Sequence, residues 1–395
     1  MSNIQEREAQ IHMQTARRLP VTLVKGEGTR VWDENGKEYL DFIAGIASTS
    51  LGHANPGLAK VIAEQANTLI HVSNVFYSVP QIELAELLVA NSCFDRAFFV
   101  NSGAEANEGA IKLARKWGNL HRGGAFEIIS TNNSFHGRTM ATVSATGTAA
   151  YREGFGPPLP GFVFVDYDDL DAIKAATNGK TVAVLLEAVQ GEGGVNVPDA
   201  NYLREVSAWC DEHDLLLILD EVQTGVGRTG TLWAYEQTGI EPDIMTLAKG
   251  LGGGVPIGCL LAKEAASVFE PGDHGTTFGG NPLATAAGTY VMQQLIDGGV
   301  MDNVTARSDQ LTQRLESLAD RSDAVEGQRG KGLLRALVLS EEIAGAVALE
   351  AMERGLFVNA VRPNAIRFMP ALTVTEDEID RAVAIVEDAL ASVTS

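Results

Sequence analysis

Two polar side chains, Asp220 and Lys249, each follow an apolar run of strand length, residues 215–219 and 244–247. Ligands of open α/β sheets bind outside the carboxyl ends of the strands, so this acid and this amine could face one crevice. Lys249 stands between an apolar stretch and a run of glycines, which would let a ligand approach the backbone closely. A partly desolvated amine in such a place suits Schiff-base chemistry with a carbonyl.

A second candidate site lies at residues 101–104. An apolar strand is expected over residues 97–100, and helical composition runs from 104 to 117, so Ser102 and Gly103 stand where a helix begins. Free N–H groups and the helix dipole favour an anion there, although a plain helix cap would look the same. No GxGxxG follows the strand and no Walker A sequence is present, so a phosphate held here would not belong to a dinucleotide or to ATP.

The same pattern of strand, polar cluster and helix repeats along the chain. Strands are expected over residues 127–130 and 182–186, with helical patterns between some of them. This order predicts an α/β fold with a mostly parallel sheet and helices on its faces. Polar clusters follow five of the strands, at Ser102, at Phe135, His136 and Arg138, at Glu187, at Asp220 and at Lys249.

The rest of the chain predicts a second, smaller α+β domain. Residues 1–55 are expected to form an arm and part of that domain, with a hairpin at Asn35-Gly36. Residues 56–285 would form the large domain, and residues 286–395, in which a long helix after Asn281 is followed by a strand pair and further helices, would complete the small one.

Composition narrows the class of protein. The 395 residues are 45% hydrophobic and 21% charged, with a net charge of −21, which disfavours a broad basic face for nucleic acid or anionic membrane. The three cysteines are far apart, so neither disulfides nor a metal site is expected. The N-terminus lacks the apolar core of a signal peptide, and no segment approaches eighteen apolar residues, so we expect a cytoplasmic protein without membrane contact.

An anion site, an aromatic side chain, a carboxylate and a buried lysine together match the needs of pyridoxal 5'-phosphate. Asp220 would keep the ring nitrogen protonated. Lys249 would hold the aldehyde and then act as the base that moves a substrate proton. A carboxylate in an apolar crevice needs a cationic partner, which the ring nitrogen would supply.

Motifs along nearly the whole chain resemble those of the class III, ornithine-type aminotransferases, a family of fold type I pyridoxal-phosphate enzymes. They stand in the family's order: YLDFIAGIASTSLGH, NSGAEANE, FHGRT, EAVQGEGG, LDEVQTGVGRTG, LAKGLGGGVPIG, HGTTFGGNPLA and RFMPALTVT. The resemblance implies a homodimer with shared active sites. It also implies these cofactor contacts: Ser102, Gly103 and Ala104 at the phosphate, Phe135 on the ring beside His136, Val222 on the opposite face, Gln223 near the ring hydroxyl, Glu187 near the ring and Thr277 reaching the other subunit's phosphate.

The resemblance also implies how substrates are chosen. Arg138 and Arg367 would each bind a carboxylate, and Glu192 would pair with Arg367 until glutamate arrives. Ile46 stands where ornithine enzymes have a tyrosine for the free α-amine, and an apolar side chain there is compatible with an acylated one. This favours N-acetylornithine as donor and 2-oxoglutarate as acceptor, in arginine biosynthesis. Donors that remain open are ornithine, 4-aminobutyrate and succinyldiaminopimelate.

Two other readings remain. An aminomutase of the glutamate-semialdehyde kind would share the fold and Lys249 but would not need the pair of Glu192 and Arg367. A pyridoxal-phosphate-binding transcription regulator would need an N-terminal helix-turn-helix module and a basic face. This acidic chain starts its catalytic-type region almost at once, which disfavours the regulator.

Overall fold

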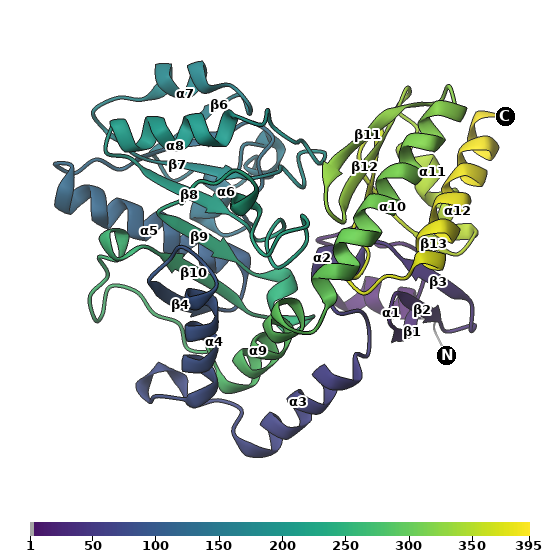
Figure 1. Cartoon of the computed structure of the whole chain (residues 1–395), viewed down its shortest axis with the longest axis horizontal. Helices are drawn as coiled ribbons and strands as arrows, with labels where there is room; N and C mark the ends of the chain where they lie inside the picture. The colour runs from purple at the N-terminus through teal and green to yellow at the C-terminus, as the bar shows by residue number, and fades with distance from the viewer. Residues whose placement is uncertain (1–3) are drawn as a thin grey trace.

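The computed structural model describes residues 4–395, which form one seven-stranded sheet and two four-stranded sheets with helices packed around them (Figure 1). The large sheet has the order β4-β10-β9-β8-β7-β5-β6. Its strands are β4 (Arg96–Val100), β5 (Glu127–Thr131), β6 (Phe162–Val165), β7 (Thr181–Glu187), β8 (Leu216–Asp220), β9 (Ile244–Leu247) and β10 (Gly258–Ala262). Neighbours from β9 to β6 are parallel, whereas β10 is antiparallel to β9 and β4. The expected mostly parallel sheet is confirmed.

The central strands β7, β8 and β9 are buried at every residue. Along β8, Leu217 and Leu219 enter one core cluster, whereas Leu216 and Ile218 enter another that includes Ile111 of the helix after β4. Alternate side chains of a strand point to opposite faces, and helices cover both faces here. This is why the strand needs a continuous apolar run rather than an alternating pattern.

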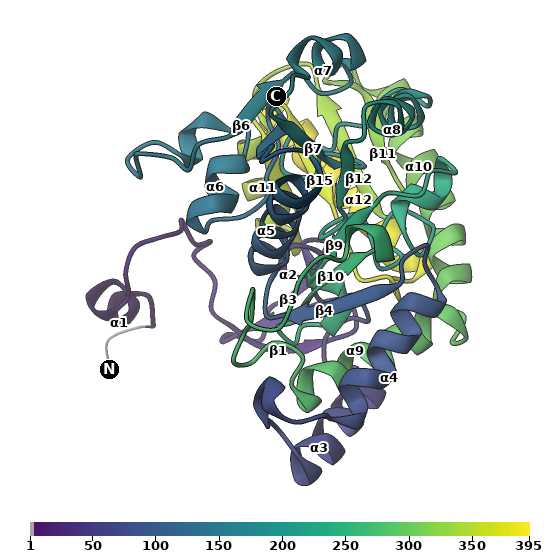
Figure 2. The ribbon, with the colours of Figure 1, turned by 90° about the vertical axis from the view of Figure 1, so that its left-hand side faces the viewer.

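Helices and short 3-10 turns connect these strands. They are α5 (Gly103–His121), α6 (Met140–Ala145), η2 (Ala149–Tyr151), α7 (Leu170–Ala176), α8 (Tyr202–Glu212), η3 (Ala234–Gln237), η4 (Lys249–Gly252) and η5 (Glu264–Ala266). Before β4 the chain forms α3 (Pro56–Thr68), η1 (Ser73–Val75) and α4 (Val79–Ala90). Both α3 and α4 pack on α9 (Pro282–Ile296), at the lower end of the molecule in Figure 2.

The N-terminal strands pair with a strand from near the C-terminus. The sheet order is β1 (Leu23–Glu27), β2 (Arg30–Asp33), β3 (Glu38–Asp41) and β13 (Leu356–Phe357), and β13 runs parallel to β3. The hairpin at Asn35-Gly36 is confirmed, because Val31 pairs with Tyr39 and Gly36 has a φ of 82°. A left-handed residue is what a tight hairpin turn requires, and glycine adopts it without strain.

The second small sheet has the order β11 (Val325–Lys331), β12 (Leu334–Leu339), β15 (Ala365–Phe368) and β14 (Asn359–Arg362), with antiparallel neighbours throughout. Helices α10 (Val300–Arg321), α11 (Ala344–Glu353) and α12 (Glu376–Thr394) pack beside it. The prediction of a single long helix after Asn281 is wrong, because α9 ends at Ile296 and α10 starts at Val300. Gly299 between them has a φ of 75°, which a right-handed helix cannot continue through.

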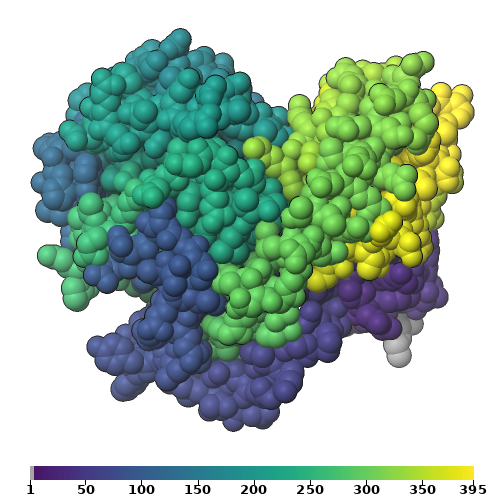
Figure 3. Space-filling model, in the orientation of Figure 1, coloured from purple at the N-terminus to yellow at the C-terminus, as the bar shows by residue number. Residues whose placement is uncertain are grey.

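Figure 3 shows a notch between the central-sheet half, in teal, and the half that contains β11 and β12, in light green. The pairing of β3 with β13 supports grouping the first segment with the last, and we keep domain boundaries after residues 55 and 285 as a proposal. Helix α1 (Ile4–Ile11) stands away from the sheets and buries none of its residues (Figure 2). Within residues 4–395, every helix falls short of the length or the hydropathy needed to cross a bilayer.

Candidate active site

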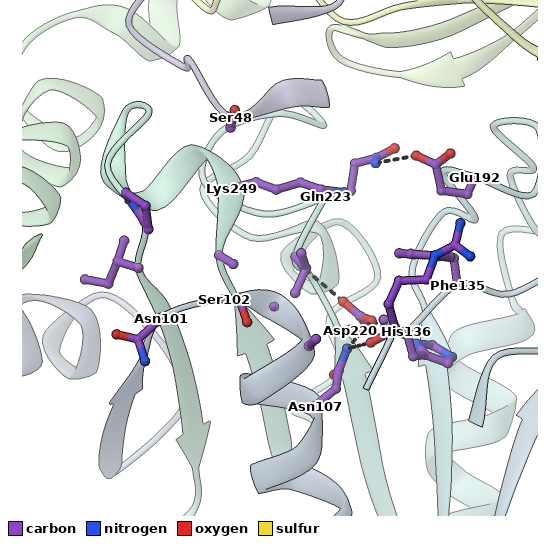
Figure 4. A pocket seen from close by; sticks show the side chains of 18 of the residues that line it. Ser48, Asn101, Ser102, Asn107, Phe135, His136, Glu192, Asp220, Gln223 and Lys249 are labelled. Atoms are coloured by element: carbon purple, nitrogen blue, oxygen red, sulfur yellow. Dashed lines mark hydrogen bonds and ion pairs between the residues drawn. The ribbon is translucent and has the colours of Figure 1, made fainter. Parts of the chain in front are cut away.

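A cavity of about 430 Å³ opens at the carboxyl ends of β7, β8 and β9, beside the start of α5. Figure 4 shows side chains converging on it from these elements. The structure brings together twelve of the residues expected from the sequence: Ser102, Gly103, Ala104, Phe135, His136, Arg138, Glu187, Glu192, Asp220, Val222, Gln223 and Lys249. They meet because parallel strands end at the same edge of the sheet.

The start of α5 forms one wall of the cavity. Ser102 caps the helix, and its Oγ accepts a hydrogen bond of 3.2 Å from the Glu105 backbone N–H. The N–H groups of Gly103 and Ala104 belong to the first turn, where an α-helix supplies no acceptor for them. A Cβ added at Gly103 would lie 2.7 Å from Cγ1 of Val222. Glycine therefore allows Val222 to pack against the helix start, and two free N–H groups face the cavity.

Asp220 lies at the centre of a buried hydrogen-bond network (Figure 4). Its Oδ2 accepts from Asn107 Nδ2 at 2.8 Å and lies 2.8 Å from His136 Nδ1, while its Oδ1 accepts from the Val222 N–H at 3.0 Å. Asn107 also donates to the His136 carbonyl and accepts from Thr246 Oγ1, each at 2.8 Å. The carboxylate thus has protein donors of its own, beyond the ring nitrogen expected from the sequence, and these fix its orientation.

Glu187 ends β7 and adds a second buried carboxyl group. It accepts hydrogen bonds from the backbone N–H of Phe135 at 3.2 Å and of Gly191 at 3.1 Å. Burial raises the pKa of Glu187 to about 7, against the smaller lowering effects of His136 and the two N–H donors. The cavity floor can therefore hold a neutral carboxylic acid next to the Asp220 network near neutral pH.

Lys249 begins η4, and one residue, Ala248, separates it from the end of β9. Its backbone φ is +43°, in the left-handed region that costs a non-glycine residue about 1–2 kcal/mol. Such strain persists only where surrounding structure enforces it, and it concentrates at functional sites. Burial lowers the pKa of the Lys249 amine, while Glu192 raises it and Arg367 lowers it further. An amine that loses its proton more easily than an ordinary lysine is suited to attack a carbonyl and to carry protons.

Arg367 approaches this cavity from β15 and is covered by neighbouring side chains. Its side chain is 1% exposed, and its Nη1 donates to Glu192 Oε1 at 2.8 Å and to Gln223 Oε1 at 3.0 Å. Its Nη2 donates to Asn359 Oδ1 at 2.8 Å, and Gln223 Nε2 donates to Glu192 at 3.2 Å. The neighbouring charge of Arg367 lowers the pKa of Glu192, although burial opposes that effect. The expected pair of Glu192 and Arg367 is present in the structure.

Ile46 and Thr277 do not line this cavity. Ile46 is 47% exposed and lies two residues before Ser48, which does line it. Thr277 lines a separate surface hollow with neighbouring residues and with Asn74 of η1. The adjacent Thr276 accepts from Asn101 Nδ2 at 3.1 Å, which ties that hollow to the start of α5. The expected roles of Ile46 and Thr277 stay predictions.

Several residues of the site were missed from the sequence, and Asn107 is the clearest case. It lies on the buried face of α5 with Ala106, Ala110 and Ile111, and is 1% exposed. A lone amide on the apolar face of a helix is a usable signal, because a buried polar side chain needs partners. Ser48 and Asn359 carried no comparable signal, since nothing in their local sequence places them at this site.

The fold is that of the fold type I pyridoxal-phosphate-dependent transferases, as comparisons with known proteins show. The sequence matches the family "Aminotransferase class-III" over residues 11–390. It is 51% identical to the acetylornithine aminotransferase of Caldanaerobacter subterraneus over 96% of this chain and 97% of that one. It is 52% identical to the acetylornithine aminotransferase of Gloeobacter violaceus over 98% of both chains. The chain belongs to the class III aminotransferases and is a pyridoxal-phosphate-dependent enzyme.

Two solved structures extend the comparison. The N-acetylornithine aminotransferase of Stenotrophomonas maltophilia superposes with a TM-score of 0.86 at 37% identity, over 99% of both chains. The ornithine aminotransferase of Toxoplasma gondii gives a TM-score of 0.95 at 34% identity, over 99% of this chain and 94% of that one. A second structure of that enzyme is described as having partial occupancy of pyridoxal phosphate at its active site. Backbone similarity is thus high with enzymes of two different names and does not separate their substrates.

Proposed function

We propose that this enzyme moves the δ-amino group of N2-acetylornithine to 2-oxoglutarate, giving N-acetylglutamate 5-semialdehyde and glutamate. The observation that carries the proposal is the pair of arginines at the cavity, of which Arg138 is open to solvent and Arg367 is held by Glu192. A donor with one carboxylate needs one free arginine, and a dicarboxylic acceptor needs both. Two relatives that are 51% and 52% identical to this chain are named acetylornithine aminotransferases, which supports this choice of donor. The apolar side chain of Ile46, which is compatible with an acylated α-amine, supports it as well. We place the reaction in arginine biosynthesis and in the cytoplasm.

The residues of the cavity fit pyridoxal phosphate, which when bound supplies an aldehyde and an electron-accepting ring for amine transfer. We assign the phosphate to the N–H groups of Gly103 and Ala104 and the hydroxyl of Ser102, where the helix dipole favours an anion. The ring would lie between Phe135 and Val222. This assignment is supported by Phe135 and Val222, which both line the cavity, and by the close approach of Val222 to the helix start.

The deeper end of the site would control the ring nitrogen. We assign that contact to Asp220, whose orientation is fixed by Asn107 and His136. A carboxylate with these donors stays where it can hold a proton on the ring nitrogen. Gln223 would lie near the ring hydroxyl and Glu187 near the ring, and two backbone N–H groups donate to Glu187 and hold its side chain in place.

Lys249 would form the covalent link to the aldehyde and would then move the substrate proton. Burial of its amine supports both roles, because a lowered pKa lets the amine give up its proton more easily than an ordinary lysine does. Lys249 is half-buried and lines the cavity, where its amine can meet a substrate. Its strained backbone keeps the amine aimed into the cavity.

We also propose a homodimer with shared active sites. The segment from the end of α3 through η1 to the start of α4, together with the residue after Thr277, exposes a set of large apolar side chains. They are Leu69, Ile70, Val75, Phe76, Tyr77, Val79 and Phe278. Tyr77 is 98% exposed, and contiguous apolar surface of this kind marks interaction sites. A second copy seated there would bring Thr277 toward the other copy's phosphate. Light scattering that gives the mass of a monomer would contradict this proposal.

The donor assignment is tested with purified enzyme, 2-oxoglutarate and one donor at a time. We expect N-acetylornithine to give the highest kcat/KM, because the free ammonium of ornithine would be left unpaired near an aliphatic side chain. The alternative with a specific observation in its favour is ornithine, since the Toxoplasma ornithine aminotransferase superposes closely. Equal reactivity with ornithine would contradict the N-acetylornithine assignment, and faster reaction with 4-aminobutyrate or succinyldiaminopimelate would replace it.

A further inference from the structure

Arg138 packs against two aromatic rings that contact each other at the mouth of the cavity. Its guanidinium carbon lies 3.9 Å from the centroid of the Tyr151 ring and 5.5 Å from that of Phe135. The rings of Tyr151 and Phe135 meet edge to face, with centroids 5.6 Å apart and planes at 83°. Figure 4 places Phe135 at the edge of the cavity. The three side chains therefore form one cluster, of which only Phe135 and Arg138 were expected at the site from the sequence.

The guanidinium of Arg138 keeps its N–H donors available. Across the part of the chain that the structure describes, it forms neither an ion pair nor a hydrogen bond, and its close contacts are these two rings. A cation held through an aromatic face is attracted to the ring without using its in-plane donors. A planar guanidinium presents those donors as a fork that fits a carboxylate. Stacking on Tyr151 thus limits the orientation of Arg138 while leaving its carboxylate-binding edge free.

The position of Tyr151 is itself fixed by bonds that lead back to Asp220. The adjacent Arg152 donates to the Thr146 carbonyl at 2.6 Å, and its guanidinium packs over the ring of Phe164 at 4.2 Å. The Thr146 hydroxyl accepts from the His136 N–H at 3.0 Å, and His136 contacts Asp220 through its ring. The loop that carries Tyr151 is therefore held in a fixed place relative to the carboxylate at the ring-nitrogen end.

We propose that Tyr151 is a positioning residue that orients Arg138 toward the α-carboxylate of the amino donor and so favours carboxylated donors. The proposal rests on the proposed function, in which Arg138 binds that carboxylate. The Tyr151 hydroxyl has no hydrogen bond within residues 4–395, so the aromatic face alone should suffice. Phenylalanine at this position should then preserve the effect, and alanine should remove it.

The test compares two donors that differ only in the carboxylate: N-acetylornithine and N-acetyl-1,4-diaminobutane. The readout is the ratio of their kcat/KM values for wild type, Tyr151→Ala and Tyr151→Phe. We expect the ratio to fall about two- to fivefold in Tyr151→Ala, mainly through the KM for N-acetylornithine, which is the fold-change that matches the loss of one exposed cation–π contact. Tyr151→Phe should keep the wild-type ratio. In an Arg138→Ala background, Tyr151→Ala should change the ratio no further.

An unchanged ratio in Tyr151→Ala would overturn the proposal. An equal loss with both donors would also overturn it, because that pattern reports a general effect through Phe135. A fall in Tyr151→Phe as large as in Tyr151→Ala would overturn the role of the aromatic face. Failure of the proposed function looks different: wild type would prefer ornithine, and the same ratio would then be measured with ornithine and 1,4-diaminobutane.

Discussion

Replacing Glu192 by glutamine tests whether this side chain masks Arg367. The variant keeps the size and the hydrogen-bonding shape of the side chain but removes the charge that faces the guanidinium at 2.8 Å. At an effective dielectric constant near 20, opposite charges about 4 Å apart attract by about 4 kcal/mol. A neutral hydrogen bond to the amide oxygen returns about 1 kcal/mol. The Glu192 side chain is 26% exposed, so solvent screening reduces the difference to about 1–2 kcal/mol.

That difference predicts how the two half-reactions change. A substrate carboxylate that reaches Arg367 must displace Glu192, and displacement of an amide costs less. At about 1.4 kcal/mol per decade, glutamate should react about 5- to 30-fold faster at low concentration in Glu192→Gln. N-acetylornithine should gain nothing or lose, because a freed Arg367 can hold its carboxylate in an unproductive position. The ratio between glutamate and N-acetylornithine should therefore rise.

Single-turnover spectra measure both reactions without a coupling enzyme, by following the cofactor absorbance as each amino donor is added. Glu187→Gln is the matched control, because Glu187 is a second cavity carboxyl group that forms no bond to Arg367. Whatever Glu187→Gln does to the rates, it should leave the ratio between the two donors near the wild-type value. A glutamate reaction that is unchanged or slower in Glu192→Gln would refute the masking argument.

Three further outcomes are expected. Asp220→Asn should bind cofactor but lose a few powers of ten in kcat, because an amide cannot keep the ring nitrogen protonated. Each power of ten corresponds to about 1.4 kcal/mol of activation free energy. A near-normal rate would mean that another group faces the ring nitrogen. Gly103→Ala should cost about 1–3 kcal/mol of cofactor affinity in a titration, through its clash with Val222, and the added change Val222→Ala should restore part of that affinity, because it removes the clash together with a ring contact. Burial raises the pKa of Glu221 from 4.5 to about 7, so the folded protein holds a proton that the unfolded chain releases. The free energy of unfolding should therefore fall by up to about 3 kcal/mol as the pH rises from 4.5 to about 7. In Glu221→Gln, urea titrations should show no such dependence of the unfolding free energy on pH.

The sequence was sufficient where local pattern and sheet geometry decide the outcome. Apolar runs such as residues 215–219 form buried strands, and side chains at the carboxyl ends of parallel strands meet at one edge, which brought Asp220 and Lys249 to the same cavity. The hairpin at Asn35-Gly36 followed from turn chemistry alone. The break between α9 and α10 was missed although Gly298-Gly299 was visible, because helical composition continues on both sides.

Contacts between distant segments could not be worked out from local pattern. Glu192 and Arg367 are 175 residues apart, and only the family resemblance paired them. The contact of Tyr151 with Arg138 depends on how the loop after α6 folds back over Phe135, which no spacing rule gives. Contacts of this kind form only when separate helices, strands and loops pack together. The periodicity of apolar residues predicts single elements and therefore cannot predict these contacts.

Backbone strain, like these long-range contacts, could not be predicted from local sequence pattern. It also explains how the site keeps its shape. Residues 44–47 form a left-handed turn, with Ile46 at a φ of 62°, a conformation that a β-branched residue rarely adopts. Asp41 Oδ1 accepts from the backbone N–H of Ile43 and Ala44 at 3.0 and 2.9 Å, which holds the turn from its start. At its other end the Ser50 hydroxyl donates to the Gly250 carbonyl at 2.7 Å, one residue after the strained Lys249.

The two strained segments therefore support each other across the boundary between sheets. The Phe42 carbonyl accepts from the Met369 N–H at 2.8 Å, and Met369 lies two residues after Arg367 at the end of β15. One short N-terminal stretch thus contacts both η4, which begins at Lys249, and the residue that follows β15, the strand that carries Arg367. Strain of about 1–2 kcal/mol per residue persists only when several neighbours enforce it, as they do here. These bonds tie the backbone next to Lys249 and the backbone next to Arg367 to the same stretch, and we expect the two side chains to keep their relative positions while an amino group is exchanged between two different substrates.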